Sequence, residues 1–343
     1  MINRKELVDI LSKVRPALAK KEIIEQATHF IFTGTHITTY NDQICIIHPY
    51  PTDFQCSVRA KEFYEILNGI TEDEIEIKRT KTQLKVNSER TKAGLTTVVD
   101  EKDKVDHMVE IIAADMKKAK WYYLPESFLK GMFLCMFSAS KDMTTGAFTC
   151  LYGNGSEIFS SDTLRASWFI MEKDEFKPPF LLPARDVAEL IKFPVTKYTV
   201  TENWMHFKTK DKVSMSVRKL EGEFPDIKPL FEIKGYSFIL PSDLKNAIDS
   251  VSILAEGELD INRVVYIKVE KGKVTCKAQK ERGWIEKTID SDYDKKRVID
   301  FTINPHFFSQ VLEKTTSITV SEEKAVFTGE NFKHIICLPI DEE

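Results

Sequence analysis

The pattern of hydrophobic and polar positions repeats itself along this chain. Leu240-Pro241 ends an apolar, strand-like run and opens a stretch with helical spacing. The same arrangement occurs 58 residues earlier at Leu182-Pro183, and 58 residues before that at Leu124-Pro125. Proline is favoured in the first turn of a helix, where its missing N–H would have no partner. Each Leu-Pro therefore predicts the end of a strand and the start of a helix.

Three weaker copies of this pattern bring the expected helix starts to six, at intervals of 56 to 66 residues. They are Ile2-Asn3-Arg4, Val58-Arg59-Ala60 and Ile303-Asn304-Pro305. A fixed long period is the signature of an internally repeated fold. The helices expected from these starts are 2–19, 61–67 and 125–137, with three more opening at Pro183, Pro241 and Asn304.

Short runs with strand-like alternation fill the intervals between the helices, and turn residues separate them. The strands expected are 29–32, 36–40, 43–47, 74–78, 83–87, 148–152, 157–159, 197–200, 204–207, 213–217, 264–269, 273–278, 317–320, 325–327 and 334–338. The sequence Gly153-Asn154-Gly155 lies between two of these strands. It lacks the Lys-Ser/Thr of a phosphate loop, and a strand follows it, so a hairpin turn is expected there.

The repeats group into three similar domains. Residues 100–120 are rich in charge and weakly patterned, which predicts a linker, and the Pro-containing stretch 222–227 predicts a second boundary. The expected fold is of the α+β class, with domains at residues 1–118, 119–232 and 233–343, each made of two strand-helix-strand units. Antiparallel sheets of this kind have edges that need neighbours. A closed ring, formed by pairing domain edges within and between chains, removes those edges.

Composition narrows the classes of function. The 343 residues are 42% hydrophobic and 30% charged, as in globular proteins, and the net charge is −4. That charge argues against a protein that coats nucleic acid with its whole surface, but it permits a local basic stripe. The first residues are amphipathic rather than typical of a signal peptide, and no apolar run reaches the roughly 18 residues of a membrane span. We therefore expect an intracellular protein.

Candidate chemistry is sparse. The six cysteines are scattered without a Cys-x-x-Cys pair, so they are expected to be reduced core residues rather than zinc ligands. Asp162 or Asp226 could act as an acid or base in an enzyme, but neither has a histidine or second acid at informative spacing. Roles in turns are favoured for both. The sequence predicts no catalytic residue, no metal site and no cofactor.

Several motifs, in order on the sixfold repeat, resemble those of the bacterial-type sliding clamp, the beta subunit of DNA polymerase III. Gly222-Glu223-Phe224-Pro225-Asp226 resembles the Gly-x-Phe-Pro-Asp that ends the second domain of that family. The other matching stretches are Ser161-Asp162-Thr163-Leu164-Arg165-Ala166, Ser252-Ile253-Leu254 and Ile336-Cys337-Leu338-Pro339-Ile340. The resemblance implies a head-to-tail homodimeric ring, with helices lining a central hole and antiparallel sheets outside.

The resemblance also implies a function without catalysis. A sliding clamp is a processivity factor in DNA replication that encircles duplex DNA and tethers DNA polymerase and other clients. The resemblance implies an ATP-dependent clamp loader as a partner. It implies a cytoplasmic location, either at a bacterial nucleoid or in the cytoplasm of a phage-infected host. Contacts with phosphates would be independent of base sequence. The cations expected on the inner face are Lys13, Lys20, Lys21, Lys130, Lys141, Arg185, Lys192 and Lys245.

A pocket for extended client peptides is implied between the second and third domains. Its matching residues are Ser161, Thr163, Leu164, Arg165, Ala166, Pro225, Leu230, Asn304, Phe307, Ile336, Leu338, Pro339 and Ile340. The sequence departs from the family at Thr163-Leu164, where the family tends to Gly-His, and in its acidic end, Asp341-Glu342-Glu343. An alternative function is therefore a clamp-like scaffold for transcription or repair proteins, with no replicative role.

The dimer contacts are implied by the same resemblance. Ile253 and Leu254 match the third-domain residues that pack on the first domain of a neighbouring chain. Ala93 and Leu95 are the expected counterparts in that first domain.

Overall fold

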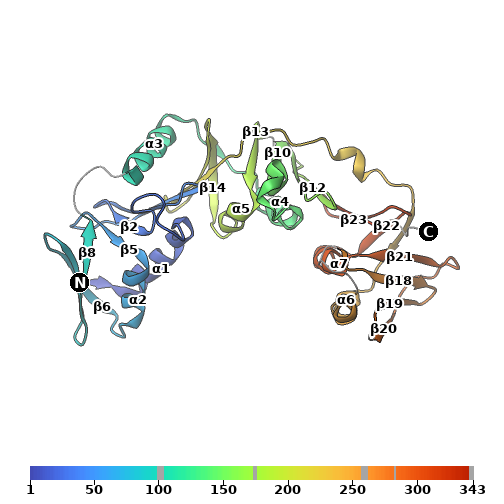
Figure 1. Ribbon diagram of the computed structural model, residues 1–343. Helices are drawn as coiled ribbons and strands as arrows, with labels where there is room; N and C mark the ends of the chain where they lie inside the picture. The colour runs from blue at the N-terminus through green and yellow to red at the C-terminus, as the bar shows by residue number, and fades with distance from the viewer. Residues whose placement is uncertain (99–103, 173–175, 256–261, 282, 340–343) are drawn as a thin grey trace. The chain divides into compact units, whose positions relative to one another are not determined.

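The computed structural model describes residues 1–98, 104–172, 176–255, 262–281 and 283–339, and Figure 1 traces its helices and strands. The chain divides into two compact units. Unit 1 comprises Met1–Leu124 and Arg185–Lys219, and unit 2 comprises Pro125–Ala184 and Leu220–Glu343. Both units are discontinuous in sequence, because the chain leaves unit 1 after Leu124 and returns to it at Arg185.

One antiparallel sheet of twelve strands forms the centre of unit 1, in the order β1-β6-β7-β8-β5-β2-β3-β4-β16-β15-β14-β9. Its strands are β1 (Ile2–Asn3), β2 (His29–Phe32), β3 (His36–Tyr40), β4 (Ile44–Pro49), β5 (Cys56–Arg59), β6 (Glu74–Arg79), β7 (Gln83–Asn87), β8 (Lys92–Val98), β9 (Tyr122–Tyr123), β14 (Val195–Val200), β15 (Trp204–Thr209) and β16 (Ser214–Arg218). The β4–β16 seam joins two distant segments, with Ile46 opposite Met215. This seam pairs a strand of the predicted first domain with a strand of the predicted second domain within one chain.

The helices of unit 1 are α1 (Arg4–Val14), α2 (Ala60–Gly69), α3 (Lys104–Lys118) and α5 (Ala184–Leu190), with the 3-10 helix η1 (Arg15–Ala17) after α1. α1 begins where the Asn3 side-chain oxygen accepts the Glu6 N–H at 3.0 Å. Leu7, Leu11 and Val14 lie on one helical face and are fully buried.

Helices cover both faces of this sheet. Phe30 and Phe32 on β2 contact Phe63 of α2, with ring centroids 6.4 and 5.9 Å apart. Ile31 lies between them and points to the opposite face, where it packs with Ile112 of α3. Figure 1 shows α3 on one side of β2 and α2 on the other. At β2, both faces of the sheet are thereby removed from water.

The predicted linker at residues 100–120 is wrong over most of its length, because Lys104–Lys118 form helix α3. Val105, Ile112 and Met116 recur at helical spacing and are buried, while Met108 and Val109 pack beside them. This stripe is narrow, and its charged flanks obscured it in the sequence. Residues 99–103, the start of the same stretch, lie outside the described residues.

Unit 2 contains two antiparallel sheets, ordered β13-β10-β11-β12-β24-β23-β22-β17 and β20-β19-β18-β21. The strands of the first are β10 (Cys150–Gly155), β11 (Glu157–Ser161), β12 (Arg165–Ile170), β13 (Phe176–Pro183), β17 (Tyr236–Ile239), β22 (Ser317–Val320), β23 (Lys324–Gly329) and β24 (Phe332–Cys337). Those of the second are β18 (Val265–Glu270), β19 (Lys273–Lys280), β20 (Gly283–Asp290) and β21 (Ile299–Ile303). The β12–β24 seam, with Arg165 opposite Ile336, again joins distant edges.

The helices of unit 2 are α4 (Phe128–Cys135), α6 (Leu244–Val251) and α7 (Pro305–Leu312), with 3-10 helices η2 (Met136–Ser138), η3 (Met143–Thr149), η4 (Lys228–Phe231) and η5 (Ser252–Leu254). α6 and α7 lie side by side in Figure 1. Ile248 of α6 and Phe308 of α7 share one core with Ile267 of β18 and Phe327 of β23. The two helices therefore fasten both sheets together.

All six predicted helix starts are confirmed, but the expected place of proline in the first turn is correct only at Pro305. Pro183 is the last residue of β13. The carbonyls of Pro125 and Pro241 accept the N–H groups of Phe128 and Leu244, each at 3.1 Å, so a turn precedes α4 and α6. The repeat thus places its prolines at or just before the helix.

We expect that Ile112→Ala lowers the free energy of unfolding by about 2–4 kcal/mol, because its side chain is fully buried between α3 and the sheet. The matched control is Ile111→Ala on the same helix, where the side chain is 41% exposed. Urea unfolding measures both variants. Equal losses for the two would contradict the packing described for α3.

Candidate DNA and peptide interfaces

A buried arginine organises the region of the predicted peptide pocket. The Arg165 side chain is 4% exposed, and its Nε lies 2.8 Å from Asp162 Oδ2. Its guanidinium also donates to the side-chain oxygen of Gln310 on α7 and lies 4.2 Å from the ring centroid of Phe307. Burial lowers the pKa of Arg165, while Asp162 opposes that shift. The hydrogen bond to Gln310 therefore ties the start of β12 to helix α7.

The loop before β12 is held by its own polar groups. Asp162 Oδ1 accepts the backbone N–H groups of Leu164 and Arg165 at 3.2 and 3.0 Å. The Ser161 hydroxyl donates to the Arg165 carbonyl at 2.9 Å. Thr163, at φ +77°, adopts the left-handed conformation that glycine takes most freely. Thr163 thus keeps the backbone of a glycine position although it has a branched side chain.

The predicted pocket residues divide into a buried wall and an exposed surface. The buried residues are Ser161, Arg165, Ala166, Asn304, Phe307, Ile336 and Leu338. Leu164 is 38% and Leu230 49% exposed, and Thr163, Pro225 and Pro339 are also exposed. The predicted Ile340 lies outside the described residues.

Backbone contacts bring several of these residues together. The Cys337 N–H donates to the Leu164 carbonyl at 2.9 Å, and Lys324 Nζ donates to the Leu230 carbonyl at 2.8 Å. Lys324 also faces Cys337 across the β23–β24 register. Leu164 and Leu230 are therefore held against the last strands of the same sheet. Pro225 lies in the irregular connection whose Phe224 stacks on Tyr152 at 5.3 Å.

A buried polar network lies beneath this surface, and the sequence analysis did not identify it. Ser138 Oγ donates to Ser167 Oγ at 2.7 Å, and Ser167 Oγ lies 2.8 Å from His334 Nδ1. Ser160 Oγ joins the network at 2.6 Å from Ser138 Oγ. His334 is fully buried, and desolvation together with the nearby Arg165 lowers its pKa well below 6.5. The imidazole is therefore neutral at pH 7.

The predicted DNA-binding cations lie on or beside the helices, and five of the eight are ion-paired. Lys13 Nζ is 2.6 Å from Asp9, Lys192 Nζ 2.7 Å from Glu189, and Lys245 Nζ 2.8 Å from Asp249. Lys130 pairs with Glu330 at 2.8 Å, and Arg185 with Asp186 at 3.4 Å. These partners reduce the positive potential of the helix surfaces.

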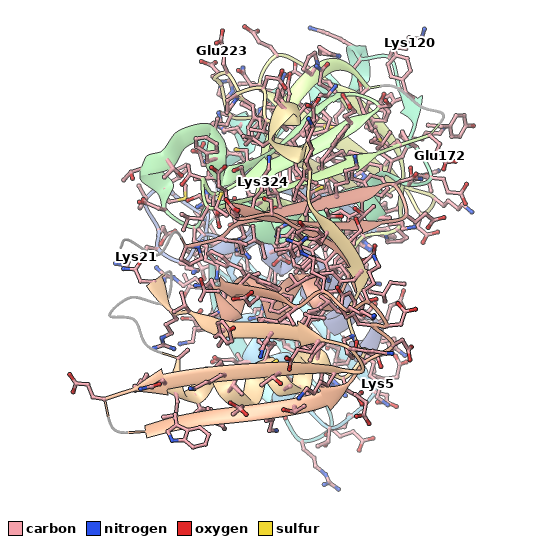
Figure 2. All side chains as sticks on the ribbon, turned by 90° about the vertical axis from the view of Figure 1, so that its right-hand side faces the viewer. Lys5, Lys21, Lys120, Glu172, Glu223 and Lys324 are labelled. Atoms are coloured by element: carbon pink, nitrogen blue, oxygen red, sulfur yellow. The ribbon has the colours of Figure 1, made fainter. Side chains whose placement is uncertain are left out.

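The remaining three cations, Lys20, Lys21 and Lys141, are exposed and lie in loops. None of them forms an ion pair within the part of the chain that the structure describes. Figure 2 shows Lys21 projecting from the surface. These loop lysines are thus freer to meet a phosphate than those on the helices.

A small cavity of about 280 Å³ in unit 1 brings two of the predicted cations together. Lys13 and Lys192 line it with His48, Thr209 and Asp211. Burial is the largest of the effects that lower the pKa of His48. The cavity combines positive and negative groups.

The predicted dimer residues differ in accessibility. Ile253 is 72% exposed, whereas Leu254 packs partly against the core of unit 2. Ala93 and Leu95 are half-buried on β8, opposite the buried Val86 and Leu84 of β7. On one side of β8, Lys92–Thr96 pair with strand β7. On its other side, Thr97 and Val98 are the only residues of β8 that pair with β5 among the described residues. An open edge therefore adjoins the predicted dimer residues.

The two aspartates considered for catalysis have structural partners. Asp162 pairs with Arg165, and Asp226 Oδ1 accepts the Lys228 N–H at 3.1 Å. Five cysteines are buried and Cys337 is exposed. Among the described residues, His, Cys, Asp and Glu form no group of three that could hold a metal ion.

No protein-family model matches the sequence, and no curated protein sequence matches it significantly. Solved structures are similar over nearly the whole chain. The DNA polymerase sliding clamp from Bacillus subtilis has a TM-score of 0.82 at 19% identity, covering 99% of this chain and 98% of that chain. A DNA polymerase III beta chain from Streptococcus pneumoniae has a TM-score of 0.80 at 16% identity, covering 98% of each chain. This chain has the sliding-clamp fold.

The Helicobacter pylori beta clamp, solved with a DNA ligase peptide, is also similar, with a TM-score of 0.80 at 13% identity over 98% of each chain. The sliding-clamp fold confirms the resemblance seen in the motifs and the predicted α+β class. The three domain boundaries and the residues assigned to DNA, peptide and dimer contacts stay predictions. None of the described helices combines the length and apolar character that a bilayer span requires.

The buried histidines predict a loss of stability in acid. An unfolded histidine takes up a proton as the pH falls below about 6.5, but His334 in the folded chain does not. The contribution of neutral His334 to the free energy of unfolding is therefore fully present above pH 6.5 and decreases as the pH falls below that value. His206 behaves in the same direction, since burial lowers its pKa to about 4. Over the 1.5 pH units from 6.5 to 5, His206 alone lowers the free energy of unfolding by about 2 kcal/mol.

We expect that His334→Gln, which stays neutral, shows a smaller decrease in unfolding free energy between pH 7 and pH 5 than the unchanged chain. Urea unfolding at both pH values measures the difference, and the value of each protein at pH 7 serves as its own reference. An identical decrease in the two proteins would contradict the neutral, buried state of His334.

Proposed function

We propose that this protein is a DNA sliding clamp, a ring-shaped processivity factor that encircles duplex DNA and tethers a DNA polymerase. The observation that carries the proposal is the similarity to bacterial clamps over 98–99% of the chain at TM-scores of 0.77–0.82. The proposed ring acts by enclosure and effective concentration and has no catalytic step of its own. The structural roles of Asp162 and Asp226 agree with a protein that is not an enzyme.

Ring closure follows from the sheet edges. Strand β8 has an open side along Lys92–Thr96, and β20 ends the four-stranded sheet of unit 2. An unpaired edge leaves backbone donors and acceptors without partners, and a second copy can supply them. Lys280 Nζ donates to the Ile253 carbonyl at 3.5 Å, so the exposed Ile253 adjoins the end of the β19–β20 hairpin. We propose that β8 and Leu95 of one chain meet β20 and Ile253 of the next, head to tail.

The proposed DNA contacts are weak and independent of sequence. The loop lysines Lys20, Lys21 and Lys141 and the ion-paired helix cations attract phosphates without reading bases. Weak, exchangeable contacts suit a ring that must slide, since enclosure rather than affinity retains the DNA. In this proposal the helices α1, α2, α4, α5, α6 and α7 face the duplex.

The proposed client site is the surface of Leu164, Leu230 and Pro339 beside the buried Arg165. The H. pylori clamp was solved with a DNA ligase peptide, and a Pseudomonas aeruginosa clamp was solved bound to griselimycin. Exposed leucines over a rigid, hydrogen-bonded wall suit an extended peptide with apolar anchors. We further propose an ATP-dependent loader as a partner and the cytoplasm, at a bacterial nucleoid or in a phage-infected cell, as the place of action.

Topological retention on DNA tests the function. The protein would be loaded onto nicked circular duplex DNA with a clamp loader and ATP, then passed through gel filtration in high salt. We expect retention on the circle and loss after the circle is linearised, because salt removes phosphate contacts but does not open a ring. Loss from both forms would contradict encirclement and favour the scaffold for transcription or repair.

A pair of variants connects retention to the proposed dimer. Ile253→Asp places a charge in the proposed interface and should yield monomers and abolish retention. Ile239→Asp is the matched control, because Ile239 is 71% exposed, as Ile253 is 72% exposed, and lies on β17. Sedimentation measures the oligomeric state of both variants. Dimers that persist in Ile253→Asp would contradict the proposed interface.

A fluorescent DNA ligase peptide tests the client site. We expect Leu164→Ala and Leu230→Ala each to weaken peptide binding about tenfold, since each removes an apolar contact worth roughly 1–2 kcal/mol. Leu220→Ala is the control, because Leu220 is 39% exposed, much as Leu164 is, and lies outside the proposed site. Fluorescence anisotropy measures the affinities. A weakening that is equal in all three variants would contradict the assignment.

A further inference from the structure

Three consecutive aromatic residues, Trp121, Tyr122 and Tyr123, end the twelve-stranded sheet of unit 1. Tyr122 and Tyr123 form β9, the last strand, which pairs with β14. Tyr123 is 80% exposed and Tyr122 is 45% exposed. Exposed apolar side chains that adjoin one another often mark an interaction site.

Lysines lie beside each ring. Lys197 Nζ is 5.1 Å from the Tyr123 ring centroid, and Lys208 Nζ is 3.9 Å from that of Trp121. Lys197 is opposite Tyr123 in the β9–β14 register and opposite Lys208 in the β14–β15 register, so these side chains share one face. On the other face, Lys120 Nζ is 5.3 Å from the Tyr122 ring centroid.

The fold holds two of the three rings, those of Trp121 and Tyr122. Trp121 Nε1 donates to the Met116 carbonyl at 3.0 Å, and Trp121 packs against the cluster between α3 and the sheet. Tyr122 lies 5.8 Å from the ring of the buried Tyr198. The face shared by Trp121 and Tyr123 is the one that α3 covers, opposite α2. It is therefore separate from the helix surfaces proposed to face duplex DNA.

The charge of this edge is not compensated. Lys120, Lys197 and Lys208 form no ion pair within the described residues, in contrast to five of the eight cations on the helices. Lys208 is half-buried, and burial together with Lys197 lowers its pKa. Figure 2 shows Lys120 reaching into solvent, and the last turn of α3 adds the exposed Lys117 and Lys118. An anion would relieve the repulsion between Lys197 and Lys208.

We propose that this aromatic–lysine edge, made of Lys120, Trp121, Tyr122, Tyr123, Lys197 and Lys208, binds single-stranded nucleic acid. Its aromatic faces offer stacking to unpaired bases, and the amines beside them offer phosphate contacts, which together are the two requirements of such sites. Duplex DNA keeps its bases stacked inside and presents phosphates alone. An acidic peptide would pair with the amines but would leave most of the aromatic surface unused.

Binding of a fluorescent oligothymidine of about 12 nucleotides to the full chain tests the proposal by anisotropy. We expect Tyr123→Ala to weaken binding about tenfold, while Tyr123→Phe keeps the affinity, because stacking needs the ring and not the hydroxyl. Lys197→Ala should reduce the slope of log K against log salt by about 0.7, the value for one phosphate of a single strand.

Tyr236→Ala is the matched control. Tyr236 is 44% exposed on the edge strand β17, and Arg297 Cζ lies 3.9 Å from its ring centroid. We expect this variant to bind the oligothymidine like the unchanged chain. Unchanged binding in Tyr123→Ala, or an equal loss in both variants, would overturn the proposal.

Competitors test the class of ligand. A duplex of the same length or a poly-glutamate peptide that displaced the oligothymidine at equal concentration would overturn the proposal in favour of a general anion site. Retention of Tyr123→Ala on circular duplex DNA separates this test from that of the clamp function, because the edge takes no part in the proposed encirclement.

Discussion

Pairing of sheet edges is the constraint on which this structure depends. Each repeat contributes a helix and a few short strands, and the outer backbone groups of such a sheet lack partners until another segment pairs with them. The β4–β16 and β12–β24 seams satisfy those groups between segments far apart in sequence. The open side of β8 and the edge strand β20 are the ones assigned to a second copy in the proposed ring. The same interaction thus builds the units and, in this proposal, the assembly.

The cations of the helices and the lysines of the aromatic–lysine edge differ in whether carboxylates neutralise them. Cations on the helices are mostly neutralised by nearby carboxylates, as in the pairs of Lys13 with Asp9 and Lys245 with Asp249. Weak attraction to phosphates suits a ring around duplex DNA, because strong contacts would impede sliding. The lysines beside Trp121 and Tyr123 have no such partners among the described residues and suit a ligand that is held by contact rather than by enclosure.

Sequence reasoning predicted the elements whose hydrophobic period is strong and missed those without one. The strand at Gln83–Asn87 was predicted with its observed bounds because buried Leu84 and Val86 alternate with polar residues. Strand β20 was missed because most of its side chains are exposed, so its register depends on backbone pairing with β19. The helix at Lys104–Lys118 was missed because its apolar stripe is narrow and its surroundings are charged.

In the candidate site, too, local features could be predicted from the sequence and long-range contacts could not. The motif around Asp162 and Arg165 was visible in the sequence, since the ion pair and the turn depend on nearby residues. The Ser138–Ser167–His334 network was not, because its members come from three separate elements and meet only after β12 pairs with β24. No local pattern encodes a contact between residues so far apart in the chain.

The interrupted path of unit 1 has a consequence for synthesis on the ribosome. Ile47 on β4 pairs with Ser214 on β16, so this pairing forms only after about 170 further residues have been synthesised. At roughly 5–20 residues per second, translation leaves that edge unpaired for about 10–30 s. During this interval the nascent chain exposes an apolar strand that could pair wrongly. The late closure of this sheet therefore lengthens the time during which the nascent chain is prone to misassembly.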